Sequence, residues 1–167
     1  MLYLFDANVL ITASNAYYPI DQIPEFWAWV QHQGKLGNIK LPIEILEEIL
    51  AGRKKDDLLL AWMKEKENQD ALKLDEAVDA ALVQKVVFDG YAPDLTDDEL
   101  EEIGRDPFLI AYCMAAPDRC VVTTEASKPS KKRQNRRIPD VCDCLSVAWC
   151  NPFHVNRVLG FHTAWKP

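Results

Sequence analysis

Short apolar segments that alternate with helical patterns constrain the fold of this chain more than any other feature. Residues 2–5, 39–41, 120–123 and 145–149 are short runs of strand-forming residues, and residues 72–74 are a weaker one. Apolar residues recur at helical spacing over residues 24–34, 43–50, 56–66, 75–88, 96–103 and 108–116. Strands separated by helices predict an α/β domain of three layers, with a central, mainly parallel β-sheet flanked by helices.

Helix boundaries carry signals of their own. Thr96 and Glu99 have the spacing of a capping box, and Gly52 is placed to end the helix predicted over residues 43–50. Asp106-Pro107 begins a strongly apolar helix, in which Pro107 fits the first helical position and Asp106 the cap.

Length and composition predict one folded domain over residues 1–167. A chain of 167 residues has the size of one domain, and 49% hydrophobic residues with 27% charged residues exclude intrinsic disorder as its main state. Neither a signal peptide nor an apolar run of roughly 18 residues is present, so we expect no membrane association. Five cysteines without the spacing of a disulfide framework or a zinc site favour the cytoplasm and free thiols.

Acidic residues follow several of the predicted strands or begin a helix. Asp6 ends the first strand, Glu48 lies with Glu44 and Glu47 on the helix after the second, Asp106 begins a later helix, and Glu125 follows the Val121-Val122 strand. Each has an ordinary alternative as a turn residue, an exposed helical residue, a cap or a loop residue. Because the carboxyl ends of parallel strands share one edge, all four carboxylates are candidates for a Mg²⁺ or Mn²⁺ site.

A basic segment contrasts with the net charge of -7. The loop at about residues 126–137 holds six basic residues and no acid: Lys128, Lys131, Lys132, Arg133, Arg136 and Arg137. The segment is therefore either a phosphate-binding patch or a solvated, mobile loop.

Four motifs together resemble the PIN-domain ribonucleases, in particular the VapC-like toxins of toxin–antitoxin pairs. Residues 3–10 (Tyr-Leu-Phe-Asp-Ala-Asn-Val-Leu) resemble the opening strand with its Asp-x-Asn motif, and residues 48–52 (Glu-Ile-Leu-Ala-Gly) resemble the Glu-Leu-x-x-Gly helix. Residues 105–111 resemble the Asp-x-x-Ile-Ala segment, and residues 121–125 resemble the strand followed by Thr-x-Asp or Thr-x-Asn. The resemblance covers nearly the whole chain and implies a PIN-like fold.

The resemblance also implies a set of site residues. It assigns metal binding and catalysis to Asp6, Glu48, Asp106 and Glu125, and supporting roles to Asn8, Thr123 and Thr124. The basic insertion after Glu125 departs from the family pattern, so Asp140 and Asp143 stay open as alternatives for the fourth acid. Aromatic residues at 15–19 and 26–29 also exceed the usual pattern and indicate a less characterised branch; for them core packing or a partner groove is favoured over base stacking.

The resemblance implies a Mg²⁺- or Mn²⁺-dependent endoribonuclease, the toxin of a type II pair, with RNA as substrate, a cognate antitoxin as partner and a homodimer as a further expectation. The six basic residues would then contact RNA phosphates. The alternative is a catalytically inactive PIN-like module that binds RNA or a partner. A haloacid-dehalogenase phosphatase is disfavoured, because it needs a second Asp at the position of Asn8. A phospho-receiver domain is disfavoured, because it needs paired acids after the first strand and only Asp6 is present there.

Overall fold

The computed structural model describes residues 1–51 and 57–166 and has an α/β fold. Four parallel strands form one sheet in the order β2-β1-β3-β4, and helices flank it to give the three-layer arrangement expected from the sequence. The predicted stop at Gly52 and the predicted helix start at Asp56 lie outside the described residues.

The central strands β1 (Leu2–Phe5) and β3 (Arg119–Val122) pair along their whole length, with Leu2 opposite Arg119 and Phe5 opposite Val122. The shorter β2 (Ile39–Lys40) lies on the other side of β1, and β4 (Trp149–Cys150) pairs with the end of β3. The predicted strand at 72–74 is reduced to a single bridge between Leu41 and Lys73. β1 and β3 read as near-continuous apolar runs because helices cover them on both faces.

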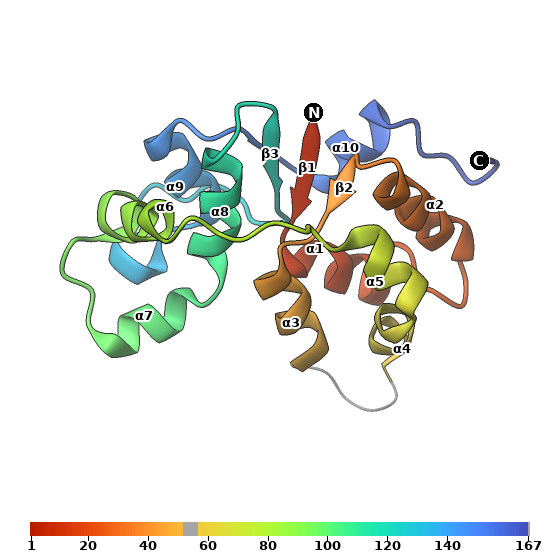
Figure 1. Cartoon of the computed structure of the whole chain (residues 1–167), viewed down its shortest axis with the longest axis horizontal. Helices are drawn as coiled ribbons and strands as arrows, with labels where there is room; N and C mark the ends of the chain where they lie inside the picture. The colour runs from red at the N-terminus through yellow and green to blue at the C-terminus, as the bar shows by residue number, and fades with distance from the viewer. Residues whose placement is uncertain (52–56, 167) are drawn as a thin grey trace.

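Two groups of helices lie on opposite sides of the strands in Figure 1. One group gathers beside β2 and consists of α2 (Pro24–Lys35), α3 (Ile43–Ala51), α4 (Leu58–Lys64) and α5 (Lys66–Leu72), with α10 (Pro152–Val158) nearby. The other gathers beside β3 and consists of α6 (Ala80–Lys85), α7 (Asp97–Ile103), α8 (Asp106–Met114) and α9 (Ile138–Leu145). Helix α1 (Ala7–Thr12) follows β1 directly and continues into a π-helical turn, η1 (Ala13–Tyr17).

Aromatic and aliphatic side chains from both helix groups form the core. Phe26, Trp27 and Trp29 of α2 are almost completely buried, and Phe26 stacks on Tyr18 with 4.1 Å between ring centroids. Core packing, the favoured interpretation of the aromatic residues at 26–29, is therefore confirmed for these three.

Several predicted boundaries are wrong for identifiable reasons. The helix expected over 75–88 begins only at Ala80, because Asp79 caps it by accepting hydrogen bonds from Ala81 N and Leu82 N at 2.8 and 3.3 Å. It continues beyond Phe88 as a second π-helical turn, η2 (Val86–Tyr91).

The last strand and one cap also differ from the prediction. The strand expected over 145–149 is present only as β4, because α9 extends to Leu145 and ends with Ser146 in the left-handed conformation (φ 57°). Asp106 is the first residue of α8 rather than its cap, which is Arg105. The capping box of Thr96 and Glu99 is confirmed.

Candidate functional site: an acidic edge beside a basic pocket

The acidic residues lie at the carboxyl edge of the sheet, near the point where the order of strand addition reverses. From β1 the chain first adds β2 on one side of the sheet and later β3 on the other, so the carboxyl ends of β1 and β3 form the switch point of this parallel sheet. Asp6 directly follows β1, and its backbone N–H still donates to the carbonyl of Val122 at 2.9 Å. The strands therefore hold Asp6 rigidly at this point.

Thr123 joins Asp6 across the switch point. Its hydroxyl donates to Asp6 Oδ2 at 3.0 Å and accepts the backbone N–H of Glu125 at 3.2 Å. Both side chains are buried: Asp6 is 3% exposed and Thr123 is fully buried. The structure thus brings the predicted supporting residue Thr123 to the predicted acid Asp6, whereas Asn8 and Thr124 lie on exposed positions nearby.

Asp106 approaches the same place from the start of α8. Burial raises its pKa well above the ordinary value, and the charges of Asp6, Glu125 and Glu48 raise it further. The hydroxyl of Tyr91 donates a long hydrogen bond of 3.5 Å to Asp106 Oδ2. Tyr91 was not predicted from the sequence, where a lone tyrosine at the end of a helical segment carries no distinguishing signal.

Asp6 shows the same electrostatic pattern. Burial raises its pKa to about 6, with additions from the charges of Glu48 and Glu125, while the Thr123 hydroxyl and the backbone of Asn8 oppose the rise. The charges of Glu48 and Glu125 act on both Asp6 and Asp106, so these two rim acids lie near the same edge of the sheet.

Glu48 and Glu125 occupy the rim and have basic neighbours. Glu48 lies on the exposed side of α3, where partial burial raises its pKa and the charge of Arg105 opposes the rise. Glu125 accepts the backbone N–H of Ile138 at 2.8 Å, at the start of α9, and the Arg137 guanidinium at 3.2 Å. A carboxylate at a helix N-terminus is stabilised by the helix dipole.

The two alternatives for the fourth acid have other partners. Asp140 accepts the Ser127 hydroxyl at 2.6 Å and the Lys128 backbone N–H at 2.8 Å, so it ties the basic segment to α9. Asp143 accepts the indole N–H of Trp149 at 2.7 Å. Of the three candidates, only Glu125 has a charge that raises the pKa values of both Asp6 and Asp106.

The donor set suits a hard divalent cation in part. Within residues 1–51 and 57–166, no three His, Cys, Asp or Glu side chains are already grouped as a metal site. Asp6, which is buried, and Asp106, which is partly buried, are nevertheless two carboxylates near each other, and Mg²⁺ commonly uses one or two carboxylates together with water and substrate phosphates. These two residues therefore fit Mg²⁺ or Mn²⁺, with Glu48 and Glu125 at the rim.

The basic segment is anchored to the body of the protein by its arginines. Arg133 lies in a short 3₁₀ turn, η3 (Arg133–Asn135), and pairs with Asp94 at 2.7 Å and through two nitrogens with Glu99, each at 2.7 Å. The guanidinium of Arg136 donates to the carbonyls of Gly90 and Asp140. These contacts argue against the alternative of a solvated, mobile loop for this part of the segment.

A polar cavity of about 280 Å³ lies between the acids and this segment. Asp106 and Glu125 line it together with Lys131, Arg136 and Arg137. Lys128, Lys131 and Lys132 are all exposed. A phosphate group entering this cavity would meet cationic side chains directly beside the acidic edge.

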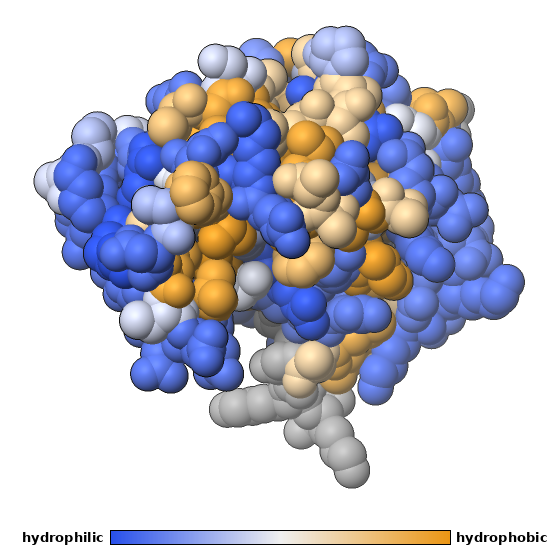
Figure 2. All heavy atoms as spheres, turned by 60° about the vertical axis from the view of Figure 1, so that its left-hand side comes forward, coloured by the Kyte–Doolittle hydropathy of each residue, from blue (hydrophilic) through white to orange (hydrophobic). Residues whose placement is uncertain are grey.

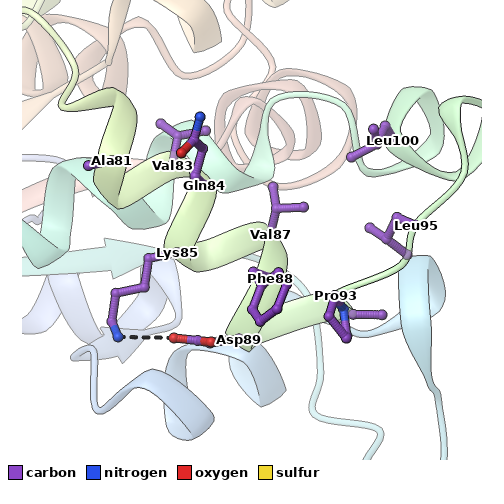
Figure 3. Close-up of a pocket in the computed structure, with 11 residues that line it drawn as sticks. Ala81, Val83, Gln84, Lys85, Val87, Phe88, Asp89, Pro93, Leu95 and Leu100 are labelled. Atoms are coloured by element: carbon purple, nitrogen blue, oxygen red, sulfur yellow. Dashed lines mark hydrogen bonds and ion pairs between the residues drawn. The ribbon is translucent and has the colours of Figure 1, made fainter.

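A larger cavity of about 720 Å³ lies away from the acids, on α6, η2 and the start of α7 (Figure 3). Its lining is mainly apolar and includes Phe88, which is 59% exposed, with a Lys85–Asp89 ion pair of 3.0 Å at its edge. Figure 2 turns this side of the molecule forward and shows hydrophobic residues exposed among hydrophilic ones. This groove lacks the grouped carboxylates of the acidic edge, so it is not the candidate catalytic site.

The fold and the site place this protein in the class of α/β proteins that have a parallel sheet with carboxylates at its switch point. The chain belongs to a family described as a domain of unknown function (DUF4411), whose model matches residues 3–163. No curated protein and no solved structure matches the chain. In the described part of the chain, no helix has the length and apolar character that a membrane crossing requires.

Proposed function

We propose that this protein is a metal-dependent endoribonuclease that hydrolyses RNA phosphodiester bonds at the edge formed by Asp6 and Asp106. One observation carries the proposal: the buried carboxylate of Asp6 and the partly buried carboxylate of Asp106 lie together at the switch point of the sheet, beside a cavity lined by Lys131, Arg136 and Arg137. Buried like charges are costly unless a cation compensates them. A divalent cation is the partner that such oxygen donors select.

Each group of residues has a distinct role in this proposal. Asp6 and Asp106 would hold Mg²⁺ or Mn²⁺, which when bound activates water and stabilises charge on the leaving oxygen. Thr123 keeps the Asp6 carboxylate in position through its 3.0 Å hydrogen bond. Lys131 and Arg137 offer positive charge to the RNA backbone and so offset the repulsion between RNA and the acids.

Partners and location form part of the same proposal. We take the protein to be the cytoplasmic toxin of a type II pair, with a cognate antitoxin and a homodimeric state, as the resemblance to VapC-like toxins implies. Co-expression with the product of an adjacent reading frame, followed by size-exclusion chromatography, tests the antitoxin and the dimer together.

The second candidate is a PIN-like module that binds RNA or a partner without cleaving. The observation in its favour is that the described residues show no ready group of three metal ligands. Such a module would have the same fold and the same basic cavity and would lack only the catalytic step.

Cleavage of a mixed RNA substrate by the purified protein distinguishes the two candidates. We expect cleavage with Mn²⁺, none with EDTA, and a loss of roughly 100-fold or more in Asp6→Asn and Asp106→Asn, which keep side-chain shape but remove charge. Asp118→Asn, an exposed acid at the opposite end of β3, is the matched control and should retain full activity. RNA binding without cleavage in every condition would establish the inactive module instead.

A further inference from the structure

A third cavity, of about 630 Å³, adjoins the acidic edge at Glu125. Glu125 lines both cavities and is their common wall. The lining residues come from the end of α1, the end of η1, the loop after β3, β4 and the start of α10, so the cavity also lies at the carboxyl end of the sheet. Its volume falls within the range of about 300–1,000 Å³ typical of small-molecule sites.

Three aromatic side chains line this cavity: Tyr17, Trp149 and Phe153. Tyr17 is 51% exposed and Phe153 is 39% exposed. They meet edge to face, with ring centroids 5.1 Å apart and an interplanar angle of 80°. The hydrogen bond from the indole of Trp149 to Asp143 fixes the third ring. The aromatic surface is therefore held in place by contacts within the protein.

Polar side chains complete the lining. Thr12 and Thr124 bring hydroxyl groups, and Asn151, whose Oδ1 accepts the His154 N–H and caps α10, brings amide N–H donors; these groups can hydrogen-bond to the edges of a nucleobase. Unpaired bases in RNA are recognised by this combination of aromatic stacking and edge hydrogen bonds. A peptide would use the aromatic surface but has no phosphate for the cationic side chains across Glu125, so continuity between the two cavities favours RNA.

We propose that the cavity lined by Tyr17, Trp149 and Phe153 binds an unpaired nucleobase of an RNA strand whose phosphate occupies the adjoining basic cavity. This inference rests on the proposed function for its substrate and adds a subsite to it, in which a base next to the cleaved bond is inserted into this cavity. Double-stranded RNA would be excluded, because its bases are stacked and paired.

The test separates base recognition from phosphate binding and from cleavage. Fluorescence anisotropy in EDTA measures binding of a labelled hexauridylate and of the same oligomer with abasic ribose at every position. We expect Tyr17→Ala and Phe153→Ala to weaken binding of the hexauridylate about tenfold each and to leave the weaker binding of the abasic oligomer unchanged. Lys131→Ala should weaken binding of both oligomers.

Two further variants control for packing. Phe153→Leu keeps an apolar side chain on α10, so thermal melting should show that it is folded. It should nevertheless bind the hexauridylate several-fold more weakly than the wild type does. Phe88→Ala removes an aromatic ring that is even more exposed but lies in the apolar groove of Figure 3, and it should change neither affinity.

The outcomes distinguish this inference from the proposed function. Equal binding of the two oligomers, or full affinity in Phe153→Leu and Tyr17→Ala, would overturn the base site even if metal-dependent cleavage were observed. Base-dependent binding without cleavage under any condition would support the base site and refute the ribonuclease. Absence of binding to either oligomer would overturn the base site.

Discussion

Asp6 and Asp106 oppose folding at neutral pH, and this cost is the physical signature of the site. The carboxyl group of Asp6 is buried and that of Asp106 is partly buried, and their pKa values are raised because burial and the neighbouring acids disfavour the charged forms. The hydrogen bonds from the Thr123 hydroxyl and the Asn8 backbone offset only part of that cost for Asp6. Residues that persist in such an arrangement are typical of functional sites.

Asp6→Asn should therefore stabilise the protein in the absence of divalent cations. A folded-state pKa of about 6, above the ordinary 3.8, means that the folded protein holds the Asp6 proton more tightly than the unfolded chain. The wild-type protein therefore loses stability as pH rises through about 6. At pH 7, Asp6→Asn should raise the free energy of unfolding by up to about 3 kcal/mol. Near pH 4 the gain should almost vanish.

Urea denaturation in EDTA at the two pH values measures this effect. Asp118→Asn, which removes an exposed charge, should change stability little at either pH. An Asp6→Asn protein that is less stable than the wild type at pH 7 would contradict the prediction.

At the scale of elements, α7 and η3 act together to hold the basic segment. Glu99 has two roles: its carboxylate accepts the Thr96 backbone N–H at the start of α7, and it pairs with Arg133. The bond from Arg133, supported by the Thr96 N–H, lowers the pKa of Glu99 to about 2. Arg133 meanwhile adopts a left-handed backbone conformation (φ 54°), which its contacts to α7 and Asp94 must hold.

Glu99→Gln should loosen the basic segment without unfolding α7. Glutamine preserves the capping-box geometry but removes the charge that pairs with Arg133. We expect trypsin to cut after Lys131, Lys132 or Arg136 several times faster than in the wild type, as followed by mass spectrometry of timed digests. Glu101→Gln, on the same helix and exposed, should digest at the wild-type rate.

At the scale of the whole molecule, the topology decides where function lies. The order β2-β1-β3-β4 places the ends of β1 and β3 at the switch point, so residues 6 and 123 meet although 117 positions separate them in the chain. The same edge carries the basic cavity and the aromatic cavity on the two sides of Glu125. The protein thus presents acids, cations and aromatic rings along one edge of its sheet.

Divalent cations should stabilise the whole molecule through this edge. A ligand that binds only the folded state adds about 2.7 kcal/mol at 100 times its dissociation constant, which corresponds to several degrees in Tm for a chain of this size. We expect Mn²⁺ to raise the Tm of the wild type and of Asp118→Asn by that amount, and to leave the Tm of Asp6→Asn and Asp106→Asn nearly unchanged. An equal increase in all four proteins would show that the cation binds elsewhere.

Local signals predicted much of the fold. The strand at residues 2–5, the helix begun by Pro24 and the capping box of Thr96 are all present, because each depends on residues close together in the chain. Helices α9 and α10 were missed, although Pro139 and Pro152 in their first turns were signals that could have indicated them. Helix α9 begins after the basic loop and helix α10 begins after a short strand, and neither segment shows apolar residues at helical spacing.

The sequence by itself determined that strands alternate with helices, that the sheet is parallel, and that acids follow the strands. These properties depend on local periodicity and on residue type. Only the tertiary structure decided which acids meet, because Asp106, Tyr91 and Thr123 come from separate elements whose proximity arises from packing. It likewise decided that Arg133 and Arg136 anchor the basic segment while Lys131 faces the acids, since a charge run in sequence does not reveal which charges find partners.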